Sequence, residues 1–422
     1  MLTSSLNKLN TNFFYSLLFS PLLAYIYKDG LGLPKYFNHP LVFVVVAYGL
    51  YFLSTKQNIR LHLFTKYILI FSIYRMLWQF LISQDKHYLT NIFYHLLYYA
   101  NFFIILIVYN TRFDDKFIEK SISLIKITVI CALIGSIAQV FDPSFLEADL
   151  SFGESREAYD ASGSIYTYRR SSIFGYIFPL STGLSFLPLV SVLTGFMLLK
   201  KDKNYIFYLL ASGLVALLSN TRFVMICFVV LTFQILVFNK HILRGSLKYF
   251  FLAVLGIFLL SNMLQYLGYD FRVWKEERLF VEGEIKSTTR VQAINTFKRF
   301  FPKRPIFGSG TLTPKMIEAS HRIGSSQIHV GYLQMLVLYG VVGCFFLFGF
   351  WYLLLRKLYK TAKLTNYWGS FFAFLVFLVA FSTHTHPSIF FYGLIFSFIF
   401  DKYYMDKYLK SVSAQAKQNI TT

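Results

Sequence analysis

The chain has 422 residues, of which 56% are hydrophobic and only 14% are charged. A soluble chain of this length needs a more charged exterior, whereas the apolar runs here are long enough to cross a bilayer, which takes about 20 residues per helix. The composition therefore predicts an all-α, polytopic membrane helix bundle. The net charge of +21 is divided among the loops between apolar runs, so we expect membrane lipids rather than nucleic acid as partners.

The apolar runs predict twelve membrane-spanning helices that form a single transmembrane domain over residues 1–410, followed by a disordered cytoplasmic tail over 411–422. Alternate connections between the runs are rich in Lys and Arg, and the positive-inside rule places these connections and both termini in the cytoplasm. The expected helices cover residues 13–28, 38–54, 62–82, 88–109, 121–141, 172–199, 204–220, 222–239, 247–266, 327–355, 365–382 and 387–404.

Two long loops are predicted on the extracytoplasmic side. The loop 142–171 is acidic and contains Tyr159, Tyr166 and Tyr168, which could stack on sugar rings or simply be solvated. The loop 267–326 is basic and carries the sequences T-T-R-V-Q-A-I-N-T-F and P-I-F-G-S-G. A charged loop between spanning helices, with an arginine, a glycine-rich turn and a histidine where the chain re-enters the membrane, suggests chemistry on an anionic, lipid-linked substrate.

Within the basic loop, the spacing of Arg290, Ile294, Phe297 and Phe301 predicts a short amphipathic helix along the membrane interface. Arg290 heads its apolar stripe, either as a functional group or as an ordinary snorkelling arginine. The more exposed basic residues of this helix are expected to form a solvated face that attracts phospholipids. They are Lys298, Arg299, Lys303 and Arg304.

The glycine-rich turn and the following histidine are further candidates. Gly308 and Gly310 would let the backbone approach a ligand or another helix, or would serve only to form a structural turn. His329 starts the next apolar run, where it is either an interfacial residue or a general base or hydrogen-bond donor, since the reference pKa of histidine lies near physiological pH.

Other basic residues lie at the same predicted face. Arg222 separates two apolar runs, as a helix-boundary residue or as a cation facing a polar cavity, and Arg169 and Arg170 precede another run. Arg75 lies in the middle of a run, where a structural ion pair and a cavity lining are both open.

The sequence predicts no metal site and no cofactor. His384 and His386 are only two possible ligands, and catalytic zinc needs three protein ligands. The three cysteines lie in apolar runs without ligand spacing and are expected to be small hydrophobic residues; they are Cys131, Cys227 and Cys344.

Taken together, these motifs resemble the O-antigen polymerase and O-antigen ligase superfamily of bacterial surface-polysaccharide enzymes. L-S-N-T-R ending in Arg222 is similar to the family's S-R at the start of a mid-chain helix. The family's loop motif R…W…P-x-x-G-x-G is matched by Arg290, Pro305, Gly308 and Gly310, but the Trp is replaced by Phe297 or has no counterpart. The family's R-x-x-G/F-x-x-P element is matched by Arg170, Phe174, Gly175 and Pro179. Its histidine motif is matched by His329, Tyr332, Leu333, Leu336, Gly340 and Gly343, with Val330 in place of asparagine. The resemblance covers roughly residues 165–345.

The resemblance implies a bundle related to C-type glycosyltransferases, with a polyprenyl-diphosphate-linked oligosaccharide as donor. Arg222 and Arg290 would then hold the diphosphate, with Arg170 as a weaker third contact. His329 would orient or deprotonate the acceptor, or contact the diphosphate. Arg169, Tyr332, Gly308 and Gly310 are further expected substrate contacts, and no metal is required because arginines supply the positive charge.

Three functions stay open at this stage. We favour a polysaccharide polymerase of the bacterial inner membrane, active in O-antigen, capsule or exopolysaccharide synthesis, with a flippase and a chain-length regulator as further partners. A ligase that transfers polymer to a lipid A core is the alternative within the family. A lipid-linked oligosaccharide flippase is the alternative of another class, but flippases commonly scatter charge through many spans, and here Arg75 and Lys126 are the intramembrane charges.

Overall fold

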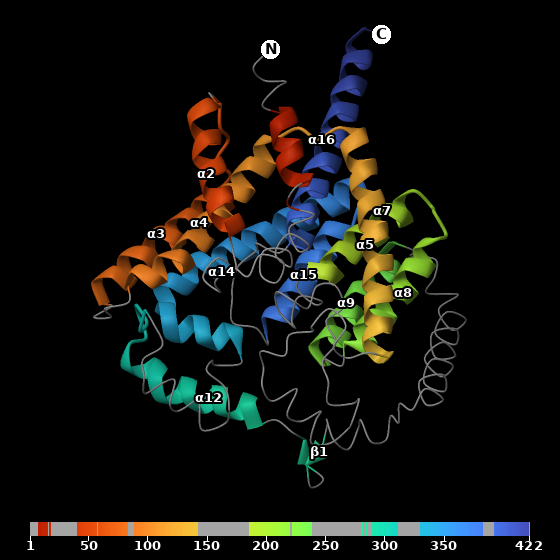
Figure 1. The fold of residues 1–422 in the computed structure, drawn as a ribbon. Helices are drawn as coiled ribbons and strands as arrows, with labels where there is room; N and C mark the ends of the chain where they lie inside the picture. Colours follow the sequence, from red (N-terminus) through yellow and green to blue (C-terminus); the bar gives the residue numbers. More distant parts are fainter. Residues whose placement is uncertain are drawn as a thin grey trace.

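The fold was obtained as a computed structural model (Figure 1). The structure describes residues 7–15, 17, 40–56, 58–82, 88–141, 185–219, 222–238, 280–281, 284–285, 288–310, 330–382 and 392–421. Residues 7–15 are helical, and the other elements follow in chain order. They are α2 (Pro40–Thr55), α3 (Leu63–Ile82), α4 (Tyr88–Asn110), α5 (Asp115–Phe141), α7 (Leu187–Leu199), α8 (Tyr205–Leu218), α9 (Arg222–Phe238), β1 (Phe280–Val281), β2 (Glu284–Ile285), α12 (Thr288–Phe300), the 3₁₀ turn η5 (Phe301–Lys303), α14 (Gly331–Thr365), α15 (Gly369–Phe381) and α16 (Tyr392–Thr421).

The helical class is confirmed for the described residues, and five predicted helices match closely in range: α2, α3, α4, α8 and α9. Several boundaries differ. Helix α5 starts at Asp115 rather than at 121, and residues 7–15 are helical ahead of the predicted start at 13. The expected helix 247–266 and the acidic loop 142–171 lie outside the described residues. The expected helical class also omitted one small feature of the basic loop, the antiparallel pair of β1 with β2, in which Phe280 is opposite Ile285.

Two predictions about the C-terminal third are wrong. Helix α14 continues to Thr365, ten residues beyond the predicted end, and contains a break at Gly340. Helix α16 continues to Thr421, so residues 411–421 are helical rather than disordered. The last turns of α16 contain alanine, lysine and glutamine, which favour a helix even without an apolar face.

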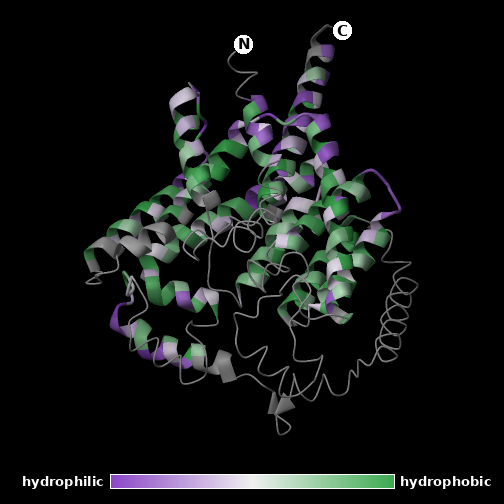
Figure 2. Ribbon diagram, in the orientation of Figure 1, coloured by the Kyte–Doolittle hydropathy of each residue, from purple (hydrophilic) through white to green (hydrophobic). Residues whose placement is uncertain are grey.

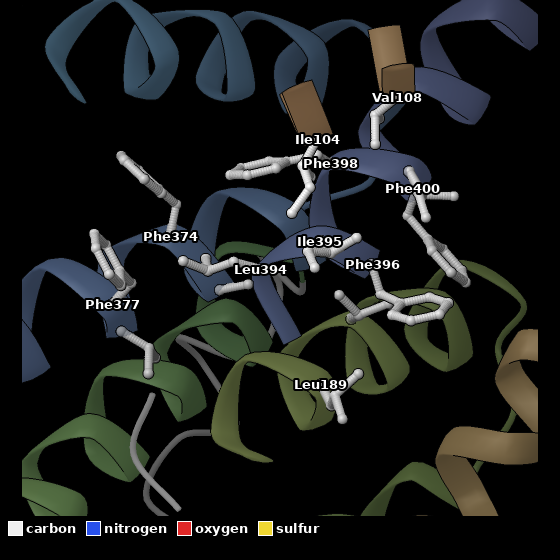
Figure 3. Packing of buried hydrophobic residues seen from close by; sticks show 14 of the residues in the cluster. Ile104, Val108, Leu189, Phe374, Phe377, Leu394, Ile395, Phe396, Phe398 and Phe400 are labelled. Atoms are coloured by element: carbon white, nitrogen blue, oxygen red, sulfur yellow. The ribbon is translucent and has the colours of Figure 1, made fainter. Parts of the chain in front are cut away.

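Buried side chains of α4, α7, α15 and α16 form the centre of the bundle, where Phe374, Phe377 and Phe396 are fully buried near Leu189 (Figure 3). The outer helices show the opposite pattern, because large hydrophobic side chains there are exposed. Leu77, Ile134, Phe141 and Leu210 are each more than half exposed. Soluble proteins rarely expose apolar surface of this extent, whereas lipid-facing helix surfaces require it.

Two described helices, α5 and α14, are long and apolar enough to cross a bilayer. Among the described residues, the apolar helices α7, α8, α9 and α15 are shorter, at 10–17 residues, and the part of α14 before Gly340 is also too short to span. Together with the exposed apolar belt, these helices are consistent with an integral membrane protein. Hydrophilic residues gather at the end of the bundle that carries both chain termini and around α12 at the opposite end (Figure 2).

The predicted cytoplasmic connections that the structure describes lie together, whereas the predicted connection near residues 240–248 is outside the described ranges. The Lys56 ammonium donates to the Asn110 carbonyl, and the Asn110 side chain exchanges hydrogen bonds with the Arg60 backbone. The loop after α7 and the C-terminal helix line one surface hollow with the start of α5. We call this face, formed by residues 56, 58–62, 110–115, 199–204, 363–367 and 402–411, the basic end of the bundle.

A buried ion pair joins two core helices near the basic end. The carboxylate of Asp401 in α16 is fully buried and accepts hydrogen bonds from the Lys357 ammonium of α14 and, at 3.1 Å, from the Tyr109 hydroxyl of α4. The Lys357 ammonium also lies 4.2 Å from the centre of the Tyr109 ring. The Lys357 ammonium compensates the negative charge of the Asp401 carboxylate, which would otherwise be costly inside the bundle.

Candidate functional site

The candidate site is built on α12 and α14, at the end of the bundle opposite the basic end (Figure 1). The predicted amphipathic helix is confirmed as α12, and it packs against the start of α14. Its buried face differs in detail from the predicted stripe. Ala293 and Phe300 are buried with Val337 of α14, whereas Ile294 is 43% exposed. The buried face is thus shifted by one residue from the predicted stripe, which corresponds to a rotation of about 100° around the helix axis.

The aromatic end of α12 continues into the turn that follows it. Phe297 and Phe301 stack with ring centres 4.7 Å apart and pack against the same cluster as Val337. The chain then forms η5 and a turn that contains Pro305, Ile306, Phe307 and Gly308. The turn is closed by a 2.9 Å hydrogen bond from the Gly308 amide to the Arg304 carbonyl.

Helix α14 is broken at Gly340, whose φ of 61° and ψ of −169° lie in a region that essentially only glycine adopts. The break divides α14 into a short arm, Gly331–Tyr339, and a long arm, Val341–Thr365. The long arm is about 37 Å long at 1.5 Å per residue, enough to span a bilayer, and the short arm is not. The short arm lies beside α12 (Figure 1).

The break leaves two helical hydrogen bonds of α14 unmade, and the turn 305–310 replaces them with four. In an unbroken helix the amides of Val341 and Val342 would donate to the carbonyls of Val337 and Leu338. These amides donate instead to Pro305 and Ile306, at 2.9 and 3.0 Å. The two freed carbonyls accept from the amides of the turn, Ser309 to Val337 and Gly310 to Leu338, each at 2.8 Å. We call this reciprocal exchange the interlock.

The interlock requires glycine on both sides. A Cβ atom added at Gly308 (φ 75°) would lie 2.4 Å from the Leu338 carbonyl oxygen, and one at Gly340 would lie 2.3 Å from the Ile306 carbonyl oxygen. The space beside Gly308 is therefore filled by the backbone of α14. Of the alternatives that the sequence left open for this turn, the structure shows a close approach to a helix.

Helix α3 completes the interlock with polar aromatic side chains that the sequence reasoning missed. The Tyr74 hydroxyl lies 2.8 Å from the Phe307 carbonyl oxygen and 3.0 Å from that of Tyr339. The Trp78 indole N–H points to the Gly308 carbonyl at 3.4 Å, and its ring packs 4.9 Å from Phe307. An aromatic pair near the end of an otherwise apolar run was the available signal, because such residues collect at membrane interfaces.

Arg75 lies next to these residues. It is 7% exposed, and its guanidinium lies over the Tyr339 ring, 5.6 Å from the centre. This contact places the guanidinium of α3 against the break in α14, and the structural ion pair and the cavity lining both stay predictions for Arg75.

The structure describes the other candidate residues to different extents. Tyr332 donates a 2.6 Å hydrogen bond to the Leu378 carbonyl and packs among aromatic rings of α14 and α15, so it joins the short arm to α15. Arg290 belongs to the first turn of α12, and Arg222 is the first residue of α9. The structure describes the backbone but not the side chains of these two arginines. The whole residues His329, Arg169 and Arg170 are outside the described ranges. Substrate contacts by all of these residues stay predictions.

The described backbone nevertheless brings two of the motifs together. Arg290 lies on the helix that leads into the turn 305–310, and the short arm begins two residues after His329. The interlock joins these two segments directly. Within the described ranges, no three side chains of His, Cys, Asp or Glu gather in a way that could hold a metal ion.

The chain was compared with known proteins. A family model described as O-antigen ligase matches residues 207–348. The match begins in α8 and ends in the long arm of α14, so it contains Arg222, α12 and the interlock. No curated protein matches the chain. The family match supports the resemblance read from the motifs: residues 207–348 are similar to the O-antigen ligase family, which is part of the O-antigen polymerase and ligase superfamily.

Proposed function

We propose that this protein is a membrane glycosyltransferase that transfers a glycan from a polyprenyl diphosphate to a lipid-linked acceptor, as a polysaccharide polymerase. The observation that carries the proposal is the family match over 207–348, because it contains both segments that the interlock joins. The donor, the acceptor and the metal independence are part of the proposal.

The chemistry needs few groups, because polyprenyl diphosphate is already a competent leaving group. The bond between the anomeric carbon and the diphosphate oxygen breaks, and a bond to the acceptor hydroxyl oxygen forms. The proton of that hydroxyl goes to a base, for which His329 is the candidate. Negative charge develops on the departing diphosphate, and Arg222 and Arg290 are proposed to stabilise it through bidentate hydrogen bonds. Arg169 and Arg170 would add weaker contacts.

The proposed location is the bacterial inner membrane, with both termini in the cytoplasm and the site on the extracytoplasmic side. The gathering of Lys and Arg at the basic end supports this orientation through the positive-inside rule, since α12 lies at the other end. Long translocated loops are exempt from that rule, so the charge of the basic loop is compatible with the same orientation.

The test uses purified protein in lipid with polyprenyl-diphosphate-linked repeat units and a metal chelator. Chain lengthening should occur, and Arg290→Ala should slow it by about a hundredfold or more. Lys298→Ala is the matched control, since Lys298 is an exposed basic residue of the same helix, and it should keep nearly full activity. Full activity in both Arg290→Ala and His329→Ala would show that the proposed site is wrong.

A ligase is the second candidate, favoured by the description of the matching family model. The two functions differ in the acceptor, which is a lipid-linked repeat unit for a polymerase and a lipid A core for a ligase. A deletion strain separates them. Loss of a polymerase leaves single repeat units on the acceptor, whereas loss of a ligase leaves lipid-linked polymer and none on the cell surface. A flippase would instead leave lipid-linked single units in the cytoplasmic leaflet.

A further inference from the structure

A third carbonyl, that of Tyr339, lies directly before the break in α14. In an unbroken α14 the Tyr339 carbonyl would accept from the Gly343 amide, at the point where the helix changes direction. Here the Tyr74 hydroxyl of α3 lies 3.0 Å from that carbonyl oxygen and 2.8 Å from the Phe307 carbonyl oxygen of the turn. One hydroxyl thus bridges the two halves of the interlock.

The chain makes room for this hydroxyl with a further glycine. A Cβ atom at Gly343 would lie 2.6 Å from Cε1 of the Tyr74 ring, so only glycine lets the ring reach the break. The Tyr74 ring is also nearly parallel to that of Trp78, with 8° between the planes and 6.4 Å between the centres. Tyr74 is therefore held in one orientation by packing on both sides.

The position of Tyr74 matters because of what the interlock connects. The turn 305–310 follows η5 and α12 without a flexible spacer, and the short arm follows His329 by two residues. Movement of the turn relative to Tyr339 would therefore move α12, with Arg290, relative to the start of α14.

We propose that Tyr74 is a positioning residue for glycan transfer: its hydroxyl fixes α12 relative to the short arm of α14 and so sets the geometry between the two proposed halves of the site. This inference rests on the proposed function. It assigns Tyr74 no contact with the substrate. Displacements of about 1 Å between reacting groups lower rates by as much as a hundredfold, so small shifts of the turn suffice.

The test compares Tyr74→Phe with Tyr67→Phe. Tyr67 lies on the same helix and its ring also packs against a glycine of α14, Gly349, but its hydroxyl makes no hydrogen bond to a described residue. Tyr74→Phe should lower kcat for chain lengthening about tenfold, with the KM of the donor and the yield of folded protein unchanged. Tyr67→Phe should change neither quantity.

Hydrogen exchange supplies a readout that does not depend on the activity. In Tyr74→Phe the amides of Ser309, Gly310, Val341 and Val342 should exchange roughly tenfold faster, since one hydrogen-bond donor to the interlock is lost. Unchanged exchange would overturn the bridging role, even if the wild-type protein transferred no glycan and the proposed function failed. Faster exchange with unaltered kcat would overturn the positioning role. Equal effects in Tyr67→Phe would also overturn it.

Discussion

Replacing Gly340 with alanine tests the interlock most directly. The added Cβ would lie 2.3 Å from the Ile306 carbonyl oxygen and 2.5 Å from the Gly308 amide nitrogen. Ordinary contact begins at 3.4 Å, so the turn would have to withdraw by 3.4 − 2.3, or about 1.1 Å. The four interlock hydrogen bonds, now 2.8–3.0 Å long, would lengthen to about 4 Å, which is beyond hydrogen-bonding distance.

The cost follows from these contacts. Four hydrogen bonds at about 1 kcal/mol each and about 2 kcal/mol of backbone strain set an upper limit of about 6 kcal/mol. Rearrangement of the turn recovers part of this, so we expect the interlock to lose about 3 kcal/mol of its stability against local opening. Since 1.4 kcal/mol corresponds to a factor of ten, amide exchange across the interlock should become about a hundredfold faster.

The assay is hydrogen exchange of the protein in lipid nanodiscs, followed in peptides that cover residues 305–310 and 337–342. Gly213→Ala in α8 is the matched control. Its Cβ would lie 2.9 Å from Cζ at the far end of the Phe228 ring, on a helical backbone, so the ring can shift and exchange at the interlock should stay unchanged. Unchanged exchange in Gly340→Ala would refute the reasoning, as would an equal change in Gly213→Ala.

Two further predictions concern the basic end. Asp401→Leu should lower the melting temperature markedly, because breaking a buried pair costs about 3–5 kcal/mol, and adding Lys357→Met should recover most of the loss; no recovery would contradict the ion-pair assignment. Burial, with the nearby cations Lys357, Lys402 and Arg60, lowers the pKa of His62 below its ordinary value of 6.5. Its neutral form therefore contributes stability above about pH 6.5 that is lost as the pH falls below it, and His62→Gln should flatten the melting temperature between pH 5 and 7. An equally steep profile in the variant would count against this role.

Helix positions could largely be predicted because the apolar runs must satisfy their backbone hydrogen bonds inside a bilayer. The same reasoning could not find the break at Gly340. Hydropathy is continuous from Gly331 to Leu355, and a glycine in such a run is equally compatible with close helix packing. Periodicity also placed Ile294 on the buried face of α12, because the pattern of one helix does not say which neighbour covers it.

The motifs identified which segments matter but not how they meet. The sequence marked Gly308 and Gly340 as parts of two separate motifs, and only the fold shows that each occupies the space beside the other. Tyr74 carried no motif at all. Its role depends on a contact with chain segments far along the sequence, which local patterns do not record.

The interlock also constrains the order in which the protein assembles. Tyr74 precedes its two partner carbonyls by 233 and 265 residues. At synthesis rates of about 5–20 residues per second, α3 waits roughly 12–50 s in the membrane before its partners emerge from the ribosome. The closure of this end of the bundle is thus a late, non-local step. A nascent chain that ends before Phe307 has α3 in place but neither of the two carbonyls that the Tyr74 hydroxyl contacts.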